Sequence, residues 1–191
     1  MCLCGLLLAA TLLTQPLFVH PVAAATSGLV AAPAAGVWLD VPFIRQEKDG
    51  CGAASIAMVM QYWRQKKALQ PDAGADAQVI QQALFSSKDH GIRAADMERY
   101  FKDHDYQVFS FTGKWEDFQQ HIQKGRPLIV ALKPSGLEAS LHYVVVVGVD
   151  PEKDVVLVND AAQRKLLQQD RKTFEHQWSA VGRWTLLALP K

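Results

Sequence analysis

Two β-branched runs in the second half of the chain constrain its fold more than any other feature. Residues 142–149 read HYVVVVGV, residues 155–158 read VVLV, and the segment between them reads DPEKD. Valine-rich runs favour strands and a short polar segment with proline favours a turn, so we expect an antiparallel hairpin here. Further strands are expected at 106–111, 127–132 and 184–189.

Helical patterns dominate the chain ahead of this hairpin. After an extended segment at 37–44, a helix is expected to begin at Cys51 and to bury one wide apolar face. That face comprises Ala53, Ile56, Val59, Met60 and Trp63. Further helices are expected at 76–85, 94–104, 115–122 and 173–178, with a break at 70–75. Because most helices precede most strands, the pattern predicts an α+β fold with an antiparallel sheet.

The first 25 residues have the layout of a secretory signal peptide. An apolar run at 3–13 is followed by a softer stretch and by Ala23-Ala24-Ala25, an A-x-A cleavage site. The run is shorter than the roughly 20 residues that a spanning helix needs. We expect cleavage after Ala25 and export to the periplasm or the medium, with an uncleaved membrane anchor as the alternative.

Composition suits one globular domain after this segment. Residues 26–37 are rich in Ala, Gly and Pro and are expected to form a linker, which leaves 38–191 as the domain. Of the 191 residues, 49% are hydrophobic, enough for a proper core. The formal net charge is +1 without a basic run, which argues against a nucleic-acid partner. We expect a monomer without a transmembrane transporter domain in this chain.

One cysteine occupies an unusual position. Cleavage after Ala25 would remove Cys2 and Cys4 and leave Cys51 as the single thiol, placed between two glycines at the expected start of a helix. The amide groups and the dipole at a helix start favour a thiolate. A reactive nucleophile is one interpretation, and a small buried apolar residue is the other.

The hairpin supplies a second chemical group. If the first and last residues of its turn pair, Val144 lies opposite Asp160 and His142 is the diagonal neighbour on the same face. Such positions lie roughly 7–8 Å apart at the backbone, within reach of a His–Asp pair. A slip of one residue would present Asn159 to the histidine instead.

Cysteine, histidine and carboxylate together form a complete set for acyl transfer. Imidazole can activate the thiol and later protonate the leaving group, and the carboxylate fixes the ring tautomer. Gln46, across a short turn from Cys51, can donate to an oxyanion together with the Cys51 amide. Each of these residues alone also has a non-catalytic interpretation: Gln46 as a surface-loop residue, His142 as a strand-end residue and Asp160 as a turn residue. Their order in the sequence together with the cysteine favours catalysis.

These residues resemble the C39 family of bacterial cysteine peptidases. The similarity rests on Gln46, GCGAA at 50–54, HYVVVVG at 142–148, VLVND at 156–160 and the tail at 174–187. The resemblance implies a papain-like cysteine peptidase fold, with an N-terminal helix bearing the cysteine packed on an antiparallel sheet bearing histidine and aspartate. It also implies Cys51 as the nucleophile, His142 as the base, Asp160 as the orienting residue and Gln46 as the oxyanion donor.

The sequence departs from the family pattern at two positions. In many members the glutamine lies six residues before the cysteine, where this chain has Arg45, and Gln46 is one residue closer. A turn one residue shorter would absorb this difference. Proline often follows the aspartate in the family, and here Ala161 takes its place.

The sequence therefore favours an exported thiol peptidase that acts on a peptide or protein substrate without a cofactor or metal. The removal of double-glycine leaders, known for members fused to peptide exporters, transfers poorly to a chain without a transporter segment. An amidase or transpeptidase would use the same residues, and an inactive peptide-binding module is a further alternative. A metal-binding protein is disfavoured because the six histidines are scattered and no His/Cys pair has zinc-site spacing.

Overall fold

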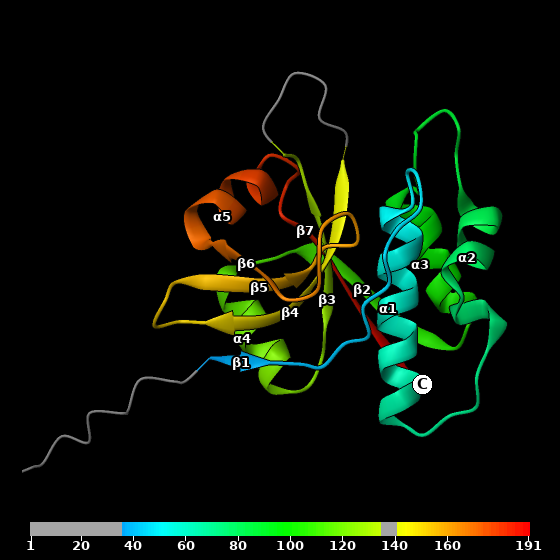
Figure 1. Cartoon of the computed structure of the whole chain (residues 1–191), viewed down its shortest axis with the longest axis horizontal. Coiled ribbons are helices and arrows are strands. Elements are labelled where there is room, and N and C mark those ends of the chain that lie inside the picture. Colours follow the sequence, from blue (N-terminus) through cyan, green and yellow to red (C-terminus); the bar gives the residue numbers. More distant parts are fainter. Residues whose placement is uncertain (1–35, 135–140) are drawn as a thin grey trace, which may run out of the picture. The chain divides into compact units, whose positions relative to one another are not determined.

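The computed structural model describes residues 36–134 and 141–191, which form one sheet with helices on both faces (Figure 1). The predicted signal peptide lies outside the described residues. The helices are α1 (Cys51–Lys66), the 3-10 turn η1 (Ala73–Ala75), α2 (Ala77–Leu84), α3 (Ala94–Asp103), α4 (Trp115–Gln123) and α5 (Arg171–Ser179). The strands are β1 (Val37–Trp38), β2 (Tyr106–Thr112), β3 (Leu128–Leu132), β4 (His142–Asp150), β5 (Val155–Asn159), β6 (Leu167–Asp170) and β7 (Trp184–Pro190).

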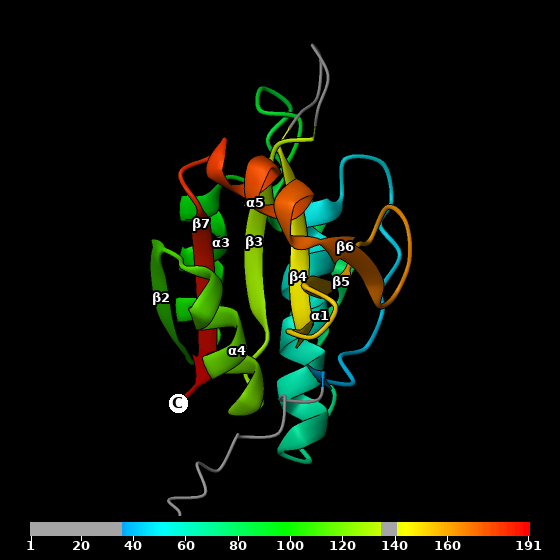
Figure 2. The same ribbon diagram turned by 90° about the vertical axis from the view of Figure 1, so that its left-hand side faces the viewer.

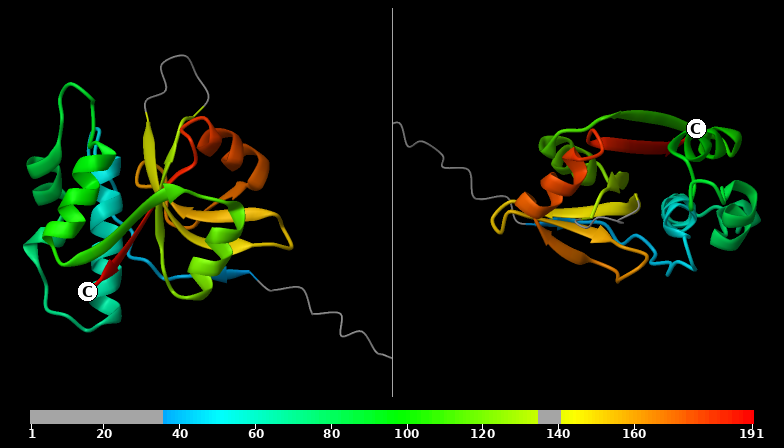
Figure 3. Two further views of the ribbon diagram at one scale, coloured as in Figure 1. Left: turned by 180° about the vertical axis from the view of Figure 1, so that it is seen from behind. Right: turned by 90° about the horizontal axis from the view of Figure 1, so that it is seen from above.

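The sheet is antiparallel at every pairing, in the order β2-β7-β3-β4-β5-β6, and β1 adds a short pairing to β4. Helices α1 to α3 lie on one side of it, and α4 and α5 lie on the other (Figure 1). Figure 2 looks onto the α4 and α5 side, and Figure 3 shows both helical layers from behind and from above. The predicted α+β architecture with an antiparallel sheet is confirmed.

Strand β4 is buried on both faces, which explains its continuous valine run. Val145 and Val147 pack into the core that α1 and α3 cover. Val144 and Val146 pack into a second core beneath α4 and α5. Each core therefore takes alternate side chains of the same strand, as the period of two in a strand requires.

Helix α1 is buried more completely than one apolar face would require. Eleven of its 16 residues are buried, in an almost unbroken run from Gly52 to Trp63. The sheet covers one side of the helix, while η1 and α2 cover another. The predicted single stripe understates this burial. Met58 and Tyr62 are buried outside the stripe, and the other buried positions there carry small side chains that allow neighbours to pack closely.

The β4–β5 hairpin differs from its predicted register at the turn and agrees with it at the other end. Asp150 pairs with Val155 rather than with Asp154, so the predicted pairing at the turn is wrong by one residue. A bulge between Val146 and Gly148 then adds one residue to β4, and Val145 pairs with Asn159. The bulge thereby restores the register that was predicted to place Val144 opposite Asp160.

Several element bounds differ from expectation. The extended segment at 37–44 forms only the two-residue strand β1, which begins at the last residue of the predicted linker. Strand β6 and the turn η1 were not predicted. Among the described residues, no helix is both long enough and apolar enough to cross a membrane.

A substitution at Phe118 tests the packing of the core beneath α4 and α5. Its ring is fully buried and lies 4.8 Å from the Trp178 ring centroid and 5.6 Å from that of Phe174. We expect Phe118→Ala to lower the free energy of unfolding by about 3–5 kcal/mol, because it leaves a cavity between aromatic rings. The control is Phe109→Ala on β2, whose side chain is 45% exposed. Urea unfolding measures both, and equal losses would contradict this account of the core.

Candidate active site

The structure brings His142 and Asp160 together at the end of the β4–β5 hairpin. His142 is the first residue of β4, Asp160 directly follows β5, and His142 Nε2 lies 2.9 Å from Asp160 Oδ1. Asp160 is 2% exposed, and its carboxylate also accepts hydrogen bonds from the Ala162 amide and the Gln163 side chain. A buried carboxylate with three donors is held in one orientation, and it holds the ring in turn.

The charges around His142 favour its protonated form. Burial lowers its pKa, but hydrogen bonds to Asp160 and Cys51, together with the negative charges of both, raise the pKa of His142 to about 9. Burial raises the pKa of Asp160, but the hydrogen bond and the positive charge of His142 bring that pKa below its usual value. Because Nε2 is engaged with Asp160, Nδ1 is the ring atom that remains for Cys51.

Cys51 is the first residue of α1, as predicted. A tight turn leads into it, in which the Gly50 amide donates to the Glu47 carbonyl at 3.1 Å and Asp49 adopts a φ of 56°. Next to Cys51, Gly52 allows the segment that carries Ile92 to approach closely, because a Cβ at position 52 would lie 3.0 Å from Ile92 Cβ. The small residues on both sides of the thiol therefore let the helix start sit closely against its surroundings.

The backbone of Gln46 is tied to the loop that carries Asp160. The Gln46 amide donates to the Ala161 carbonyl at 3.0 Å, and the Arg45 side chain donates to the Gln163 carbonyl at 3.3 Å. Gln46 Oε1 is buried and has no hydrogen-bond partner among the described residues. The structure thus places Gln46 in the loop before Cys51, but it contains no bond from its side chain to the other three candidate residues.

Asn159 lies outside this cluster. It is fully buried, its side chain donates to the Val41 carbonyl at 3.1 Å, and its oxygen accepts the Leu166 amide at 3.0 Å. The alternative in which Asn159 bonds the histidine is wrong in this structure, since both polar groups of its side chain are engaged elsewhere. Its role is to tie the segment before Gln46 to β5.

Two further residues at the site were not predicted. Gln163 donates to Asp160 Oδ2 at 2.6 Å, and its position three residues after an aspartate was the only sequence signal for it. Tyr143 is buried, and burial together with the charge of Cys51 raises its pKa. Tyr143 packs into the core on the α1 side of the sheet and against the Trp184 ring.

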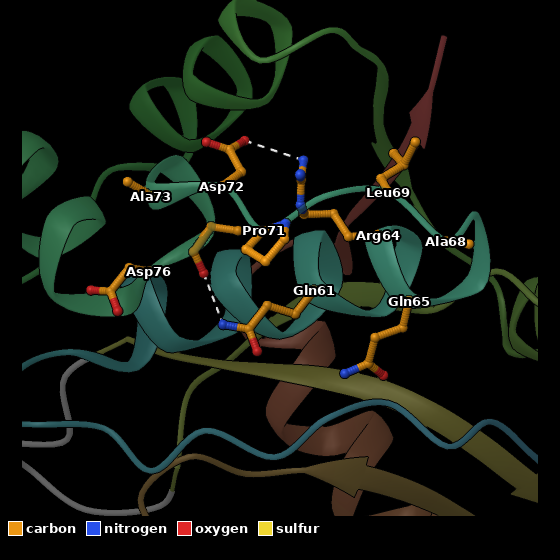
Figure 4. Close-up of a pocket in the computed structure, with 10 residues that line it drawn as sticks. Gln61, Arg64, Gln65, Ala68, Leu69, Pro71, Asp72, Ala73 and Asp76 are labelled. Carbon is orange, nitrogen blue, oxygen red and sulfur yellow. Dashed lines mark hydrogen bonds and ion pairs between the residues drawn. The ribbon is translucent and has the colours of Figure 1, made fainter.

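One cavity lies away from this cluster. It has a volume of about 580 Å³ and lies along the second half of α1, where Arg64 pairs with Asp72 at 3.3 Å (Figure 4). A cavity of about 360 Å³ adjoins the candidate site, with Gln46 and Gly50 in its wall. Because chemistry depends on the reacting groups rather than on volume, the Cys51, His142 and Asp160 cluster is the candidate site.

In the part of the chain that the structure describes, no three His, Cys, Asp or Glu residues are grouped to hold a metal ion.

Solved structures with the same fold are cysteine peptidases. A C39-like peptidase from Bacillus anthracis is 18% identical with a TM-score of 0.62, covering 83% of this chain and 99% of that chain. A double glycine motif protease from an AMS/PCAT transporter, solved with its leader peptide, is 20% identical with a TM-score of 0.57, covering 81% and 95%. Xylellain, a cysteine protease from Xylella fastidiosa, is 12% identical with a TM-score of 0.53, covering 84% and 88%. At these identities the likeness shows the fold alone, and it confirms the predicted papain-like fold.

The sequence comparisons identify the family independently of the fold. A search of curated proteins found no match. Residues 38–185, by contrast, match the Peptidase_C39 like family. This span covers nearly all of the described residues, including Cys51, His142 and Asp160. The chain therefore belongs to the Peptidase_C39 like family.

Proposed function

We propose that this protein is a cysteine peptidase that hydrolyses peptide bonds, with Cys51 as the nucleophile. The observation that carries the proposal is the hydrogen bond of 2.9 Å between the buried Asp160 carboxylate and the His142 ring, which also bonds Cys51, the first residue of α1. Peptidase activity of the structural neighbours and membership in the family support the same reaction. The peptide-bound state of one neighbour supports a peptide substrate.

The proposed reaction begins from a thiolate–imidazolium pair. Cys51 sulfur attacks the carbonyl carbon of the substrate, and the tetrahedral intermediate carries its negative charge on oxygen. Nδ1–H of His142 then protonates the leaving nitrogen as the C–N bond breaks, which leaves a thioester and a neutral ring. The neutral ring next takes a proton from water as the hydroxide adds to the thioester. The C–S bond then breaks, the acid product departs, and the thiolate and the imidazolium of the starting pair are restored.

Asp160 and Gln46 have supporting roles in this proposal. The Asp160 carboxylate keeps the proton of His142 on Nε2 and favours the imidazolium. Gln46 and the Cys51 amide at the helix start supply hydrogen bonds to the oxyanion. The turn from Glu47 to Gly50 is short enough to compensate for the single residue by which Gln46 differs from the family pattern.

Substitution of the four candidate residues tests these roles. We expect Cys51→Ser and His142→Ala to abolish hydrolysis of a peptide library, because each removes a reacting group. Asp160→Asn should be milder than either. Gln46→Ala should lower the rate on the order of 10²-fold, the usual cost of one oxyanion donor. The assay is digestion under reducing conditions, and circular dichroism checks that each variant folds.

The outcomes of this assay separate the competing functions. Rapid cleavage by Cys51→Ser would show that the nucleophile is assigned wrongly. Peptide binding without cleavage by the wild type would indicate an inactive binding module. Release of ammonia from carboxamides, or peptide joining, with intact peptide bonds elsewhere would indicate an amidase or a transpeptidase. If Gln46→Ala alone left the rate of hydrolysis unchanged, another group would be the oxyanion donor, and the peptidase assignment would still hold.

The raised pKa of His142 predicts the alkaline limit of the reaction. The ring is charged in the active form, so kcat/KM should fall as the pH rises through about 9. Since this pKa lies above the ordinary 6.5, the interactions that raise it also stabilise the fold. Their contribution to stability is fully present below about pH 6.5 and is lost as the pH rises through about 9. Asp160→Asn removes a hydrogen bond and a charge that raise this pKa, so its alkaline limb should move toward neutral pH. An unchanged limb in a pH–rate profile would contradict the proposed coupling.

Export is a further part of the proposal, motivated by the apolar run and by Ala23-Ala24-Ala25. Mass spectrometry of the protein recovered from a bacterial envelope or medium should find a chain that begins at Thr26. Replacing Ala25 with a bulky residue should slow processing, because the cleavage site requires small side chains. Intact protein with Met1 retained in the cytoplasm would contradict export.

A further inference from the structure

A cavity of about 360 Å³ opens beside the first turn of α1. Gly50, the residue directly before Cys51, and the small side chain of Ala54 form its helical wall. Gln46 lies on the loop side, and Gln81 and Asp76 line it from α2 and its N-terminal cap. Its volume falls within the roughly 300–1,000 Å³ of ligand pockets. The cavity therefore adjoins the proposed nucleophile but is separate from the His142 and Asp160 side of the site.

Two amide side chains in its wall lack hydrogen-bond partners for their oxygens. Gln46 Oε1 and Gln81 Oε1 are buried, and neither accepts a bond from the described residues. The last torsion of a glutamine side chain is broad and roughly two-fold, so no bond to these oxygens opposes a half-turn of either amide. A ligand with N–H donors in the cavity would supply the partners that these oxygens lack.

The charges in the wall favour a cationic donor. Glu47 and Asp76 contribute two negative charges against the single positive charge of Arg45. Among the described residues, Glu47 Oε1 accepts only the neutral Gln78 side chain, at 2.9 Å, whereas Asp76 Oδ1 accepts the Gln78 and Val79 amides at the start of α2. Arg45 is directed toward the Gln163 carbonyl, which lies in the Asp160 loop. The cavity thus combines a net negative wall with buried amide oxygens that lack partners, and such acceptors suit the N–H groups of a guanidinium or ammonium group.

We propose that this cavity is a substrate subsite that binds a basic side chain, arginine or lysine, of the peptide. The inference rests on the proposed peptidase function and adds a substrate class to it. Gln81 contacts the bound side chain and determines this preference. Gln46 contributes its oxygen to the same side chain, so a basic residue also orients the amide that is proposed to serve the oxyanion.

Peptide binding to the catalytically inactive variant Cys51→Ala tests the subsite without relying on turnover. A model hexapeptide is varied one position at a time between arginine, lysine, glutamine and norleucine, and binding is measured by calorimetry. At one position we expect arginine to bind about tenfold more tightly than norleucine, which corresponds to about 1.4 kcal/mol. Gln81→Lys in the same background should abolish that preference by repulsion, and Gln81→Glu should strengthen it.

The matched control is Gln82→Lys, which adds the same charge to the next residue of α2, where the side chain is exposed. It should leave the preference unchanged. Equal losses in Gln81→Lys and Gln82→Lys would reduce the effect to overall charge and would overturn the subsite. The absence of any preference for a basic residue at every position, including the absence of binding, would overturn it as well.

The two proposals fail in distinguishable ways. If the wild type cleaves the peptide library without any basic preference, the subsite is wrong and the peptidase function stands. If the wild type cleaves nothing while Cys51→Ala binds arginine peptides in a Gln81-dependent way, the subsite stands and the peptidase function is wrong.

Discussion

The pairing of β4 with β5 is the constraint on which the rest of the site depends. Both partners of the His142–Asp160 hydrogen bond come from this one hairpin, at the end remote from its turn. A strand register off by one residue would turn Asp160 to the other face of the sheet. The bulge between Val146 and Gly148 determines this register, and burial of β4 on both faces makes any other pairing costly.

The remaining parts of the site are attached to this hairpin by hydrogen bonds rather than by apolar packing alone. Asn159 binds the Val41 carbonyl ahead of the Gln46 loop, and the Gln46 amide binds the Ala161 carbonyl after Asp160. Helix α1 follows within five residues of Gln46, so these bonds also limit where Cys51 can lie. The backbone carbonyl of Ala161 makes this contact, which explains why an alanine serves where the family often has proline.

The sequence predicted the parts of the fold that have a strong local pattern. The start of α1 at Cys51 was predictable from two glycines and an apolar run, and the β4–β5 hairpin from its valines. Strand β6 was not, because LQQD is a short edge strand with one apolar residue and no alternation to detect. The bulge was also hidden, since an extra valine in a run of valines leaves no trace in the pattern. The predicted proximity of His142 and Asp160 was nevertheless right, because the error at the turn and the bulge cancel.

The neighbouring residues Asn159 and Asp160 show why sequence order alone could not assign their roles. Either side chain can accept a hydrogen bond from a histidine, and the two point to opposite faces of β5. The amide lies among backbone groups, where its donor and its acceptor each find one partner. The carboxylate lies among donors only, from His142, Ala162 and Gln163. A carboxylate in the first environment would leave the Val41 carbonyl without a donor, and an amide in the second would direct an N–H group at other donors. The surroundings therefore require asparagine first and aspartate second, and an aspartate beside the ring favours the charged histidine on which the proposed mechanism depends.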